Sequence, residues 1–118
     1  ENWTIFSGMD EQCLFAAMSG AHGNVGSTLN FMPGVYREIR KSAEEGNYHY
    51  GIQLQNRANK ITRIMQSYGF ESSIKPVMHK IGFDFGKPCL PNLPLPEKDL
   101  HGLYNELDKT DFLELVQM

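Results

Sequence analysis

Short extended stretches and one helical stretch alternate over the first 30 residues. β-Branched and aromatic residues over 3–6 predict a strand that Gly8 ends. Apolar residues at helical spacing then predict a short helix that begins near Asp10 and ends at Gly20. The small, glycine-punctuated residues over 21–28 predict a second strand. Strand, helix and strand in this order are typical of α/β proteins.

Beyond residue 30 the pattern is helical. Helices are predicted from Pro33 to Gly46, from about Tyr48 to Tyr68, over 72–81 and from Pro96, with a final turn near 112–115. Four prolines over 83–96 exclude a regular helix or a central strand, so this segment is predicted to be an extended connector. Two strands do not make a stable sheet alone, so we expect the strands to need partners from outside this sequence.

Polar groups emerge where each predicted strand stops. Gly8, Asp10 and Glu11 follow the first strand, and Ser27 stands at the end of the second. Ligands of α/β proteins bind at the carboxyl ends of strands, and carboxylate and hydroxyl groups there can bond a polar ligand. The alternative for the two acidic residues is a structural one, because negative charge also stabilises the N-terminus of a helix.

The motifs Gly8-x-Asp10-Glu11 and Gly26-Ser27-Thr28-x-Asn30 resemble the N-acetylneuraminate lyase branch of the pyruvate-dependent aldolases, a superfamily that includes dihydrodipicolinate synthase. The resemblance implies an α/β fold, the C-terminal part of a (β/α)8 TIM barrel with its last two strands and a C-terminal helical extension. Residues 1–45 would form the last two β/α units, and residues 46–118 the helical region. A whole barrel needs about 250 residues. We therefore expect these 118 residues to be part of a larger enzyme.

The resemblance also implies a class I aldolase that cleaves N-acetylneuraminate to N-acetylmannosamine and pyruvate through a Schiff base on lysine. That lysine belongs to the sixth strand, and all seven lysines of this chain fall in predicted helices or the connector. No catalytic residue is therefore expected in this chain, which should be inactive alone. The matching residues Gly8, Asp10, Glu11 and Ser27 would bind the sugar tail, and Val25 and Gly26 would line the pyruvate end of the pocket.

Further expectations concern partners and location. The family needs no metal or organic cofactor, and its helices help to build homotetramers. The net charge of −3 gives no electrostatic footprint for nucleic acid or an anionic membrane. Two cysteines without metal-site or redox-motif spacing suggest free thiols in a reducing compartment, so a cytoplasmic location is expected.

Two functional alternatives stay open: another pyruvate-dependent sugar-acid aldolase or dihydrodipicolinate synthase-like enzyme, and a non-catalytic helical module that acts in assembly. A complete small α-rich domain is the structural alternative. His22 could be taken for a general base, but a structural loop histidine is the preferred interpretation. Asn30 is a candidate cap for the helix that begins near Pro33.

Overall fold

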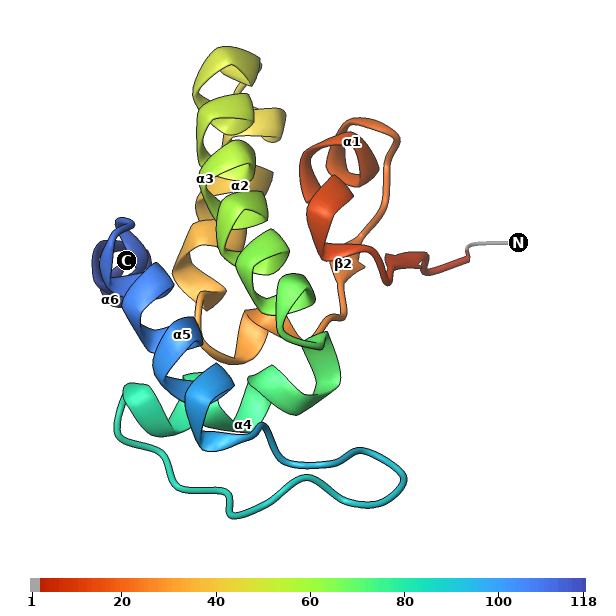
Figure 1. The fold of residues 1–118 in the computed structure, drawn as a ribbon. Helices are drawn as coiled ribbons and strands as arrows, with labels where there is room; N and C mark the ends of the chain where they lie inside the picture. The colour runs from red at the N-terminus through yellow and green to blue at the C-terminus, as the bar shows by residue number, and fades with distance from the viewer. Residues whose placement is uncertain (1–2) are drawn as a thin grey trace.

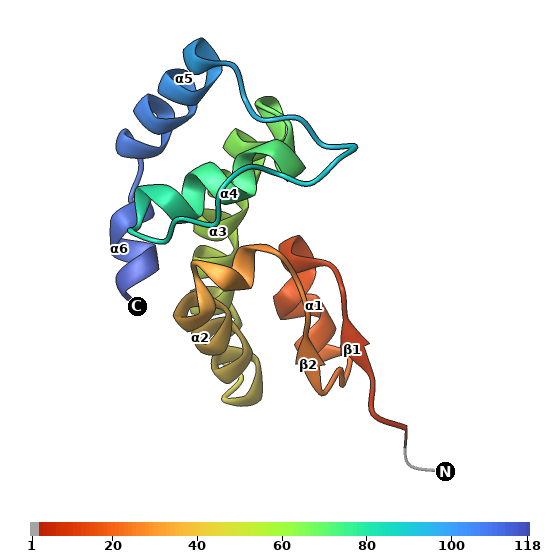
Figure 2. The ribbon, with the colours of Figure 1, turned by 90° about the horizontal axis from the view of Figure 1, so that it is seen from below.

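The first unit of the fold is a pair of short parallel strands joined through a helix. The structure is a computed structural model that describes residues 3–118. Strand β1 (Phe6–Ser7) leads into the 3-10 helix η1 (Asp10–Gln12) and helix α1 (Cys13–Met18), and the chain returns as β2 (Gly23–Asn24). Phe6 pairs with Gly23 and Ser7 with Asn24, and Figure 2 shows the two strands side by side. The predicted strand, helix and strand are therefore present.

Both strands are shorter than the sequence predicted. The strand expected over 3–6 begins only at Phe6, and the one expected over 21–28 is confined to Gly23–Asn24. Main-chain pairing continues a little further, because the Val25 amide donates to the Ser7 carbonyl at 2.9 Å. The chain then turns into the 3-10 helix η2 (Thr28–Asn30), whose first amide is bound by a side chain instead of a strand.

The helices follow the predicted order. They are α2 (Pro33–Glu44), α3 (Tyr48–Ser67), α4 (Phe70–Lys80), α5 (Glu97–Asp108) and α6 (Phe112–Gln117), and Figure 1 shows α2 and α3 packed along each other. Helix α4 begins two residues earlier than predicted and contains Pro76 in its interior. The amide of Tyr50 donates to the side chain of Asn47, which caps α3, and Gly69 follows this helix with a φ of 91° that favours glycine.

One hydrophobic core joins the first unit to all the long helices. The apolar stripe of α3 is buried at Leu54, Ala58, Ile61 and Met65. It packs in a cluster with residues of the other helices: Leu14, Val35, Tyr36, Ile39, Leu103, Leu107, Phe112 and Leu115. Each buried Leu, Ile, Val, Met or Phe side chain contributes about 1.5–3 kcal/mol when it leaves water. A Cβ at Gly51 would lie 2.3 Å from Ser42 Oγ, so the absence of a side chain there lets α3 approach α2.

Large apolar side chains remain exposed around the first unit. Met18, the last residue of α1, is 50% exposed. The others in this part of the chain are Trp3, Ile5, Phe6, Met9, Phe15 and Val25. The small sheet and α1 thus present an apolar surface that the helices after β2 do not cover.

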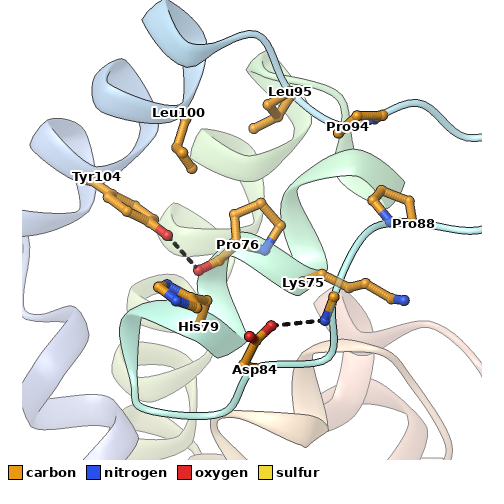
Figure 3. Close-up of a pocket in the computed structure, with 10 residues that line it drawn as sticks. Lys75, Pro76, His79, Asp84, Pro88, Pro94, Leu95, Leu100 and Tyr104 are labelled. Carbon is orange, nitrogen blue, oxygen red and sulfur yellow. Dashed lines mark hydrogen bonds between the residues drawn. The ribbon is translucent and has the colours of Figure 1, made fainter.

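The segment 83–96 is an extended connector, as predicted. It is held to α4 by Lys75, whose Nζ donates to the carbonyls of Phe85 at 3.0 Å and Lys87 at 2.6 Å. A cavity of about 260 Å³ lies between α4, the connector and α5. Figure 3 shows that both polar and apolar side chains line this cavity, where the Tyr104 hydroxyl donates to the Pro76 carbonyl. In the described residues, no helix is both long enough and apolar enough to cross a membrane.

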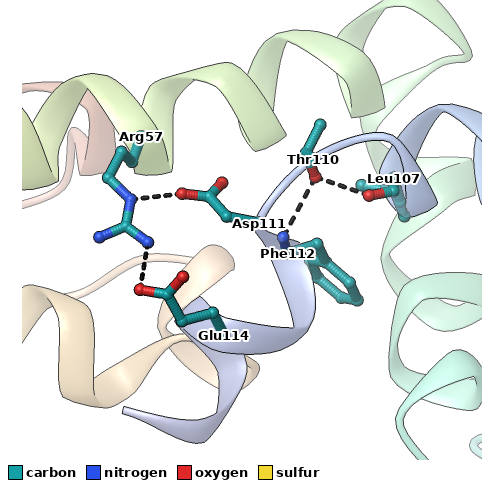
Figure 4. A network of polar contacts seen from close by, with 6 residues as sticks. All are labelled: Arg57, Leu107, Thr110, Asp111, Phe112 and Glu114. Carbon is teal, nitrogen blue, oxygen red and sulfur yellow. Dashed lines mark hydrogen bonds and ion pairs between the residues drawn. The ribbon is translucent and has the colours of Figure 1, made fainter.

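Helix α6 is attached to α3 by a charged network. Arg57 on α3 donates through Nε to Asp111 and through Nη2 to Glu114, the latter at 2.6 Å (Figure 4). The hydrogen bonds to Glu114 and Asp111 raise the pKa of Arg57 above its ordinary value. The Thr110 hydroxyl accepts from the Phe112 amide and donates to the Leu107 carbonyl, which forms the turn between α5 and α6.

We predict that Arg57→Met lowers the free energy of unfolding by about 1 kcal/mol, because it removes two ion pairs at once, and in the pair with Asp111 both side chains are less than one-third exposed. Chemical denaturation at low and high salt measures this loss, which should shrink as salt screens the pairs. The matched control is Lys41→Met, since Lys41 pairs with Glu45 at 4.0 Å and both side chains are more than half exposed. Equal losses in the two variants would contradict the prediction.

Candidate functional site

A cavity opens at the carboxyl ends of β1 and β2. Its volume is about 450 Å³. The lining residues come from the two segments that follow the strands and from α3 and α4: Gly8, Asp10, Glu11, Val25, Gly26, Ser27, Gln66, Phe70 and Glu71. The structure thus brings together in one wall all four residues that the resemblance suggests for sugar binding, although they lie up to 19 positions apart in the sequence.

Asp10 joins the two segments. Its side chain is only 6% exposed, and Oδ2 accepts hydrogen bonds from the amide of Thr28 at 3.0 Å and from its hydroxyl at 2.7 Å. The residue that caps η1 is Met9, which forms no side-chain cap bond. The Asp10 carboxylate therefore caps η2, the helix after the other strand, where its charge also suits the helix N-terminus.

A tyrosine extends this contact into the core. The hydroxyl of Tyr36 lies 2.7 Å from Thr28 Oγ1, and both residues are buried. Burial raises the pKa of the Tyr36 phenol well above its ordinary value, so it stays protonated at neutral pH. Since Thr28 gives its single hydroxyl proton to the carboxylate, Tyr36 must be the donor to Thr28. The chain of hydrogen bonds runs from Tyr36 through Thr28 to Asp10.

Polar side chains of α3 hold the other side of the first turn. Gln55 donates to the Asp10 carbonyl at 3.1 Å and accepts from the Leu14 amide at 3.0 Å. Asn59 donates to the Glu11 carbonyl, and Gln66 donates to Glu11 Oε1, each at 3.1 Å. Sequence reasoning did not identify these three α3 residues as part of the site. Their spacing of four and seven places them on one helix face, which is the signal that could have indicated a polar contact.

Glycine is required at one position of the cavity wall. A Cβ at Gly26 would lie 1.5 Å from Asp10 Oδ1, so no other residue fits beside this carboxylate as it is placed. Oδ1 is itself buried and accepts no hydrogen bond from the described residues. Gly26 therefore lies against Asp10, and the suggested roles of Asp10 at the sugar end and of Gly26 at the pyruvate end stay predictions. Val25, the other residue suggested there, lines the cavity and is 66% exposed.

The remaining candidates have structural contacts. His22 lies just before β2, where its Nδ1 accepts a hydrogen bond from the Ile5 amide at 3.1 Å, so the ring joins the residues that precede the two strands. Asn30 was expected to cap α2, but Met32 occupies the cap position, and the Asn30 side chain donates to the Ser27 carbonyl at 2.9 Å. That expectation was wrong because η2 already uses Asn30 to close its own turn.

The floor beneath β2 is fixed by Arg40 and a buried thiol. Arg40 donates to the Asn24 side chain at 3.2 Å and to the Ala21 carbonyl at 2.9 Å. The Cys13 thiol donates to the same Asn24 oxygen, and burial raises its pKa to about 11. This cysteine is therefore a protonated packing group at neutral pH, whereas Cys89 is exposed; both are free.

The cavity wall is rich in hydrogen-bond acceptors. Its ionisable residues are three carboxylic acids, Asp10, Glu11 and Glu71, and the lining residues include no lysine, arginine or histidine. Such a wall favours ligands that present hydroxyl groups and disfavours a phosphate, since like charges repel. Within residues 3–118, no three or more His, Cys, Asp or Glu side chains gather closely enough to hold a metal ion.

Comparison with known proteins identifies the same group of enzymes from sequence and from structure. The model of the dihydrodipicolinate synthetase family matches residues 1–110. N-Acetylneuraminate lyase from Danio rerio is 34% identical over 97 residues, which cover 80% of this chain and 32% of that protein. A 2-dehydro-3-deoxy-phosphogluconate/2-dehydro-3-deoxy-6-phosphogalactonate aldolase from Sulfurisphaera tokodaii is 28% identical over 90% of this chain and 37% of its own length.

Solved structures agree with these relatives. The 2-keto-3-deoxygluconate aldolase of Sulfolobus sulfataricus, in complex with D-KDPG, superposes with a TM-score of 0.86 and 26% identity over 98% of this chain and 40% of that one. N-Acetylneuraminate lyase from Fusobacterium nucleatum, complexed with pyruvate, gives 0.83 and 25% over 91% and 36%. The chain thus spans about a third of the length of the relatives that it matches.

We predict that Gly26→Ala lowers the free energy of unfolding by about 1–3 kcal/mol, because the new methyl group must displace the Asp10 carboxylate. Thermal unfolding followed by circular dichroism measures the loss. Gly8→Ala is the matched control, since a Cβ there meets nothing within 4 Å, and it should change stability by less than about 0.5 kcal/mol. An unchanged melting temperature in Gly26→Ala would show that Asp10 is not held as described.

Proposed function

The chain belongs to the dihydrodipicolinate synthetase family, and we propose that it forms the sugar-binding end of a pyruvate-dependent aldolase that acts on a sugar acid. Residues 1–45 would supply the last two β/α units of a (β/α)8 barrel, and residues 46–118 the helical region that follows. The observation that carries the proposal is the acceptor-rich cavity that Gly8, Asp10, Glu11 and Ser27 line together at the carboxyl ends of two parallel strands.

Part of the support comes from the exposed apolar surface of the first unit. A two-stranded ribbon this short is not stable on its own, and both of its outer edges have unused main-chain groups. Phe6 is 58% exposed and Phe15 is 62% exposed, which is unusual for large apolar side chains next to a well-packed core. The preceding strands and helices of a barrel would pair with these edges and cover these side chains.

We propose N-acetylneuraminate as the substrate, cleaved to N-acetylmannosamine and pyruvate. The Danio rerio relative at 34% identity is an N-acetylneuraminate lyase, and the cavity offers carboxylates and a serine to a polyhydroxylated chain. A site built to bond hydroxyl groups discriminates strongly against substrates that lack them. Pyruvate would be held by a lysine outside these residues, whose covalent bond to the ketone requires no metal or organic cofactor.

A phosphorylated sugar acid is the second candidate, because the Sulfurisphaera tokodaii relative is named for phosphorylated substrates. The charge of the cavity argues against it. Asp10, Glu11 and Glu71 line the wall without a basic residue among its lining side chains, so a phosphate would meet repulsion with no compensating partner.

For the complete protein we further propose self-association through the helical region, which sedimentation velocity would measure.

The proposal is tested by trapping. The complete protein is treated with pyruvate and borohydride, and the intact mass and the modified peptide are determined. We expect one reduced pyruvate adduct on a lysine outside residues 1–118, because the seven lysines of the chain lie on helices, in the connector or after α5. Absence of an adduct would favour a non-catalytic helical module, and an adduct on Lys75 or Lys80 would also contradict the proposal.

We predict that Glu11→Gln raises the KM for N-acetylneuraminate by on the order of tenfold and leaves the KM for pyruvate in the reverse reaction unchanged, because a charged acceptor for sugar hydroxyls is removed. Steady-state kinetics in both directions provide the measurement. Glu44→Gln is the matched control, because Glu44 is an exposed carboxylate at the end of α2 that does not line the cavity. Equal changes for both substrates would mean that Glu11 is only structural.

A further inference from the structure

The two segments that carry the candidate sugar-binding residues are joined by one buried contact. Asp10 precedes Glu11 on the first segment, and Thr28 follows Ser27 on the second. The carboxylate of Asp10 accepts both the amide and the hydroxyl of Thr28, at 3.0 and 2.7 Å. Any movement between these two residues therefore changes the separation of the Glu11 and Ser27 side chains.

The contact is fixed from the core side by Tyr36. Thr28 is fully buried and Tyr36 is 2% exposed, so water does not compete for the hydrogen bond between their hydroxyls. A threonine hydroxyl can rotate. Because the oxygen of Thr28 accepts a hydrogen bond from Tyr36, its own proton points toward Asp10. Tyr36 thus selects the rotamer in which Thr28 binds the carboxylate.

The same carboxylate is limited on its other side. Gly26 lies against Oδ1, and Gln55 on α3 holds the Asp10 carbonyl at 3.1 Å. Asp10 is thus held in place by contacts with η2, with the wall of the cavity and with α3. Hydrogen bonds to a charged group are stronger than neutral ones, and their geometry is correspondingly well defined.

We propose that Thr28 and Tyr36 are positioning residues that act through Asp10 to hold Glu11 and Ser27 against the same sugar substrate. The inference rests on the proposed function of the cavity, but it assigns a role to two buried residues that do not line it. Their effect should be much larger at the sugar end than at the pyruvate end, because the hydrogen bonds involved join the residues next to Glu11 and Ser27.

The experiment compares Thr28→Val and Thr28→Ser in the complete protein. Valine keeps the shape of threonine without its hydroxyl, so the KM for N-acetylneuraminate, and that for N-acetylmannosamine in the reverse reaction, should rise on the order of tenfold. The KM for pyruvate should stay within about twofold of the wild-type value, because uniform binding at the pyruvate end would be unchanged. Serine retains the hydroxyl and should restore the sugar KM.

The matched control is Thr62→Val, which removes a buried hydroxyl from α3 that donates only to the Ala58 carbonyl. It should leave both KM values unchanged. Because KM does not depend on the amount of active enzyme, partial unfolding of a variant does not imitate the expected result. If Thr28→Val does not fold, Tyr36→Phe tests the same chain, with Tyr104→Phe as its control, since Tyr104 donates to the Pro76 carbonyl at the other cavity.

The outcomes separate the two proposals. An active wild-type protein whose Thr28→Val variant loses affinity for sugar and pyruvate equally, or for neither, would overturn the positioning role and leave the aldolase proposal standing. The positioning role would also fail if Thr28→Ser behaved like Thr28→Val. A wild-type protein that traps no pyruvate would overturn the aldolase proposal, and the positioning role would fall with it.

Discussion

The hydrogen bonds between Asp10 and Thr28 are the interaction on which the arrangement of the cavity depends. They join two turns that the sequence separates by 18 positions, and they do so at the point where both strands have ended. Strand pairing itself covers only two residues on each side. The side-chain contact therefore replaces the main-chain ladder as the link between the two segments, and a charged carboxylate at the start of η2 compensates for the early end of the sheet.

This link is stable because side chains of α3 form hydrogen bonds with the main chain of the first turn. Its apolar stripe packs into the core, while Gln55 and Asn59 on an adjacent face satisfy the carbonyls of Asp10 and Glu11. Buried main-chain carbonyls that lacked such partners would destabilise the turn by about 1–3 kcal/mol each. The longest helix of the chain thus has two functions, as the centre of the core and as the support of the candidate site.

The sequence predicted the helices well because each repeats apolar residues at a helical period and has a clear end signal, such as Pro33 at the start of α2 and Gly69 after α3. It indicated the six lining residues that follow the strands because the motifs there are distinctive, but it did not indicate Gln66, Phe70 and Glu71 on α3 and α4. It did not predict the short strands, since strand length depends on pairing partners, nor the cap formed by Asp10 on η2, since that contact is long-range. The contact of Tyr36 with Thr28 could not be predicted either, because Tyr36 stands at an apolar position of its helix like any other core residue.

Polar contacts and exposed apolar side chains lie close together in the first unit. Asp10 is held by Thr28 and Glu11 by Gln66. Trp3, Phe15 and further apolar side chains of the same unit are exposed to solvent. Exposed apolar surface beside a preorganised polar wall is the arrangement expected where further structure completes a site. Burial of the apolar side chains would provide the free energy of association, and the polar wall would need no rearrangement. The proposed barrel meets both conditions, since strands that paired with β1 would cover the apolar side and place their own carboxyl ends at the same cavity.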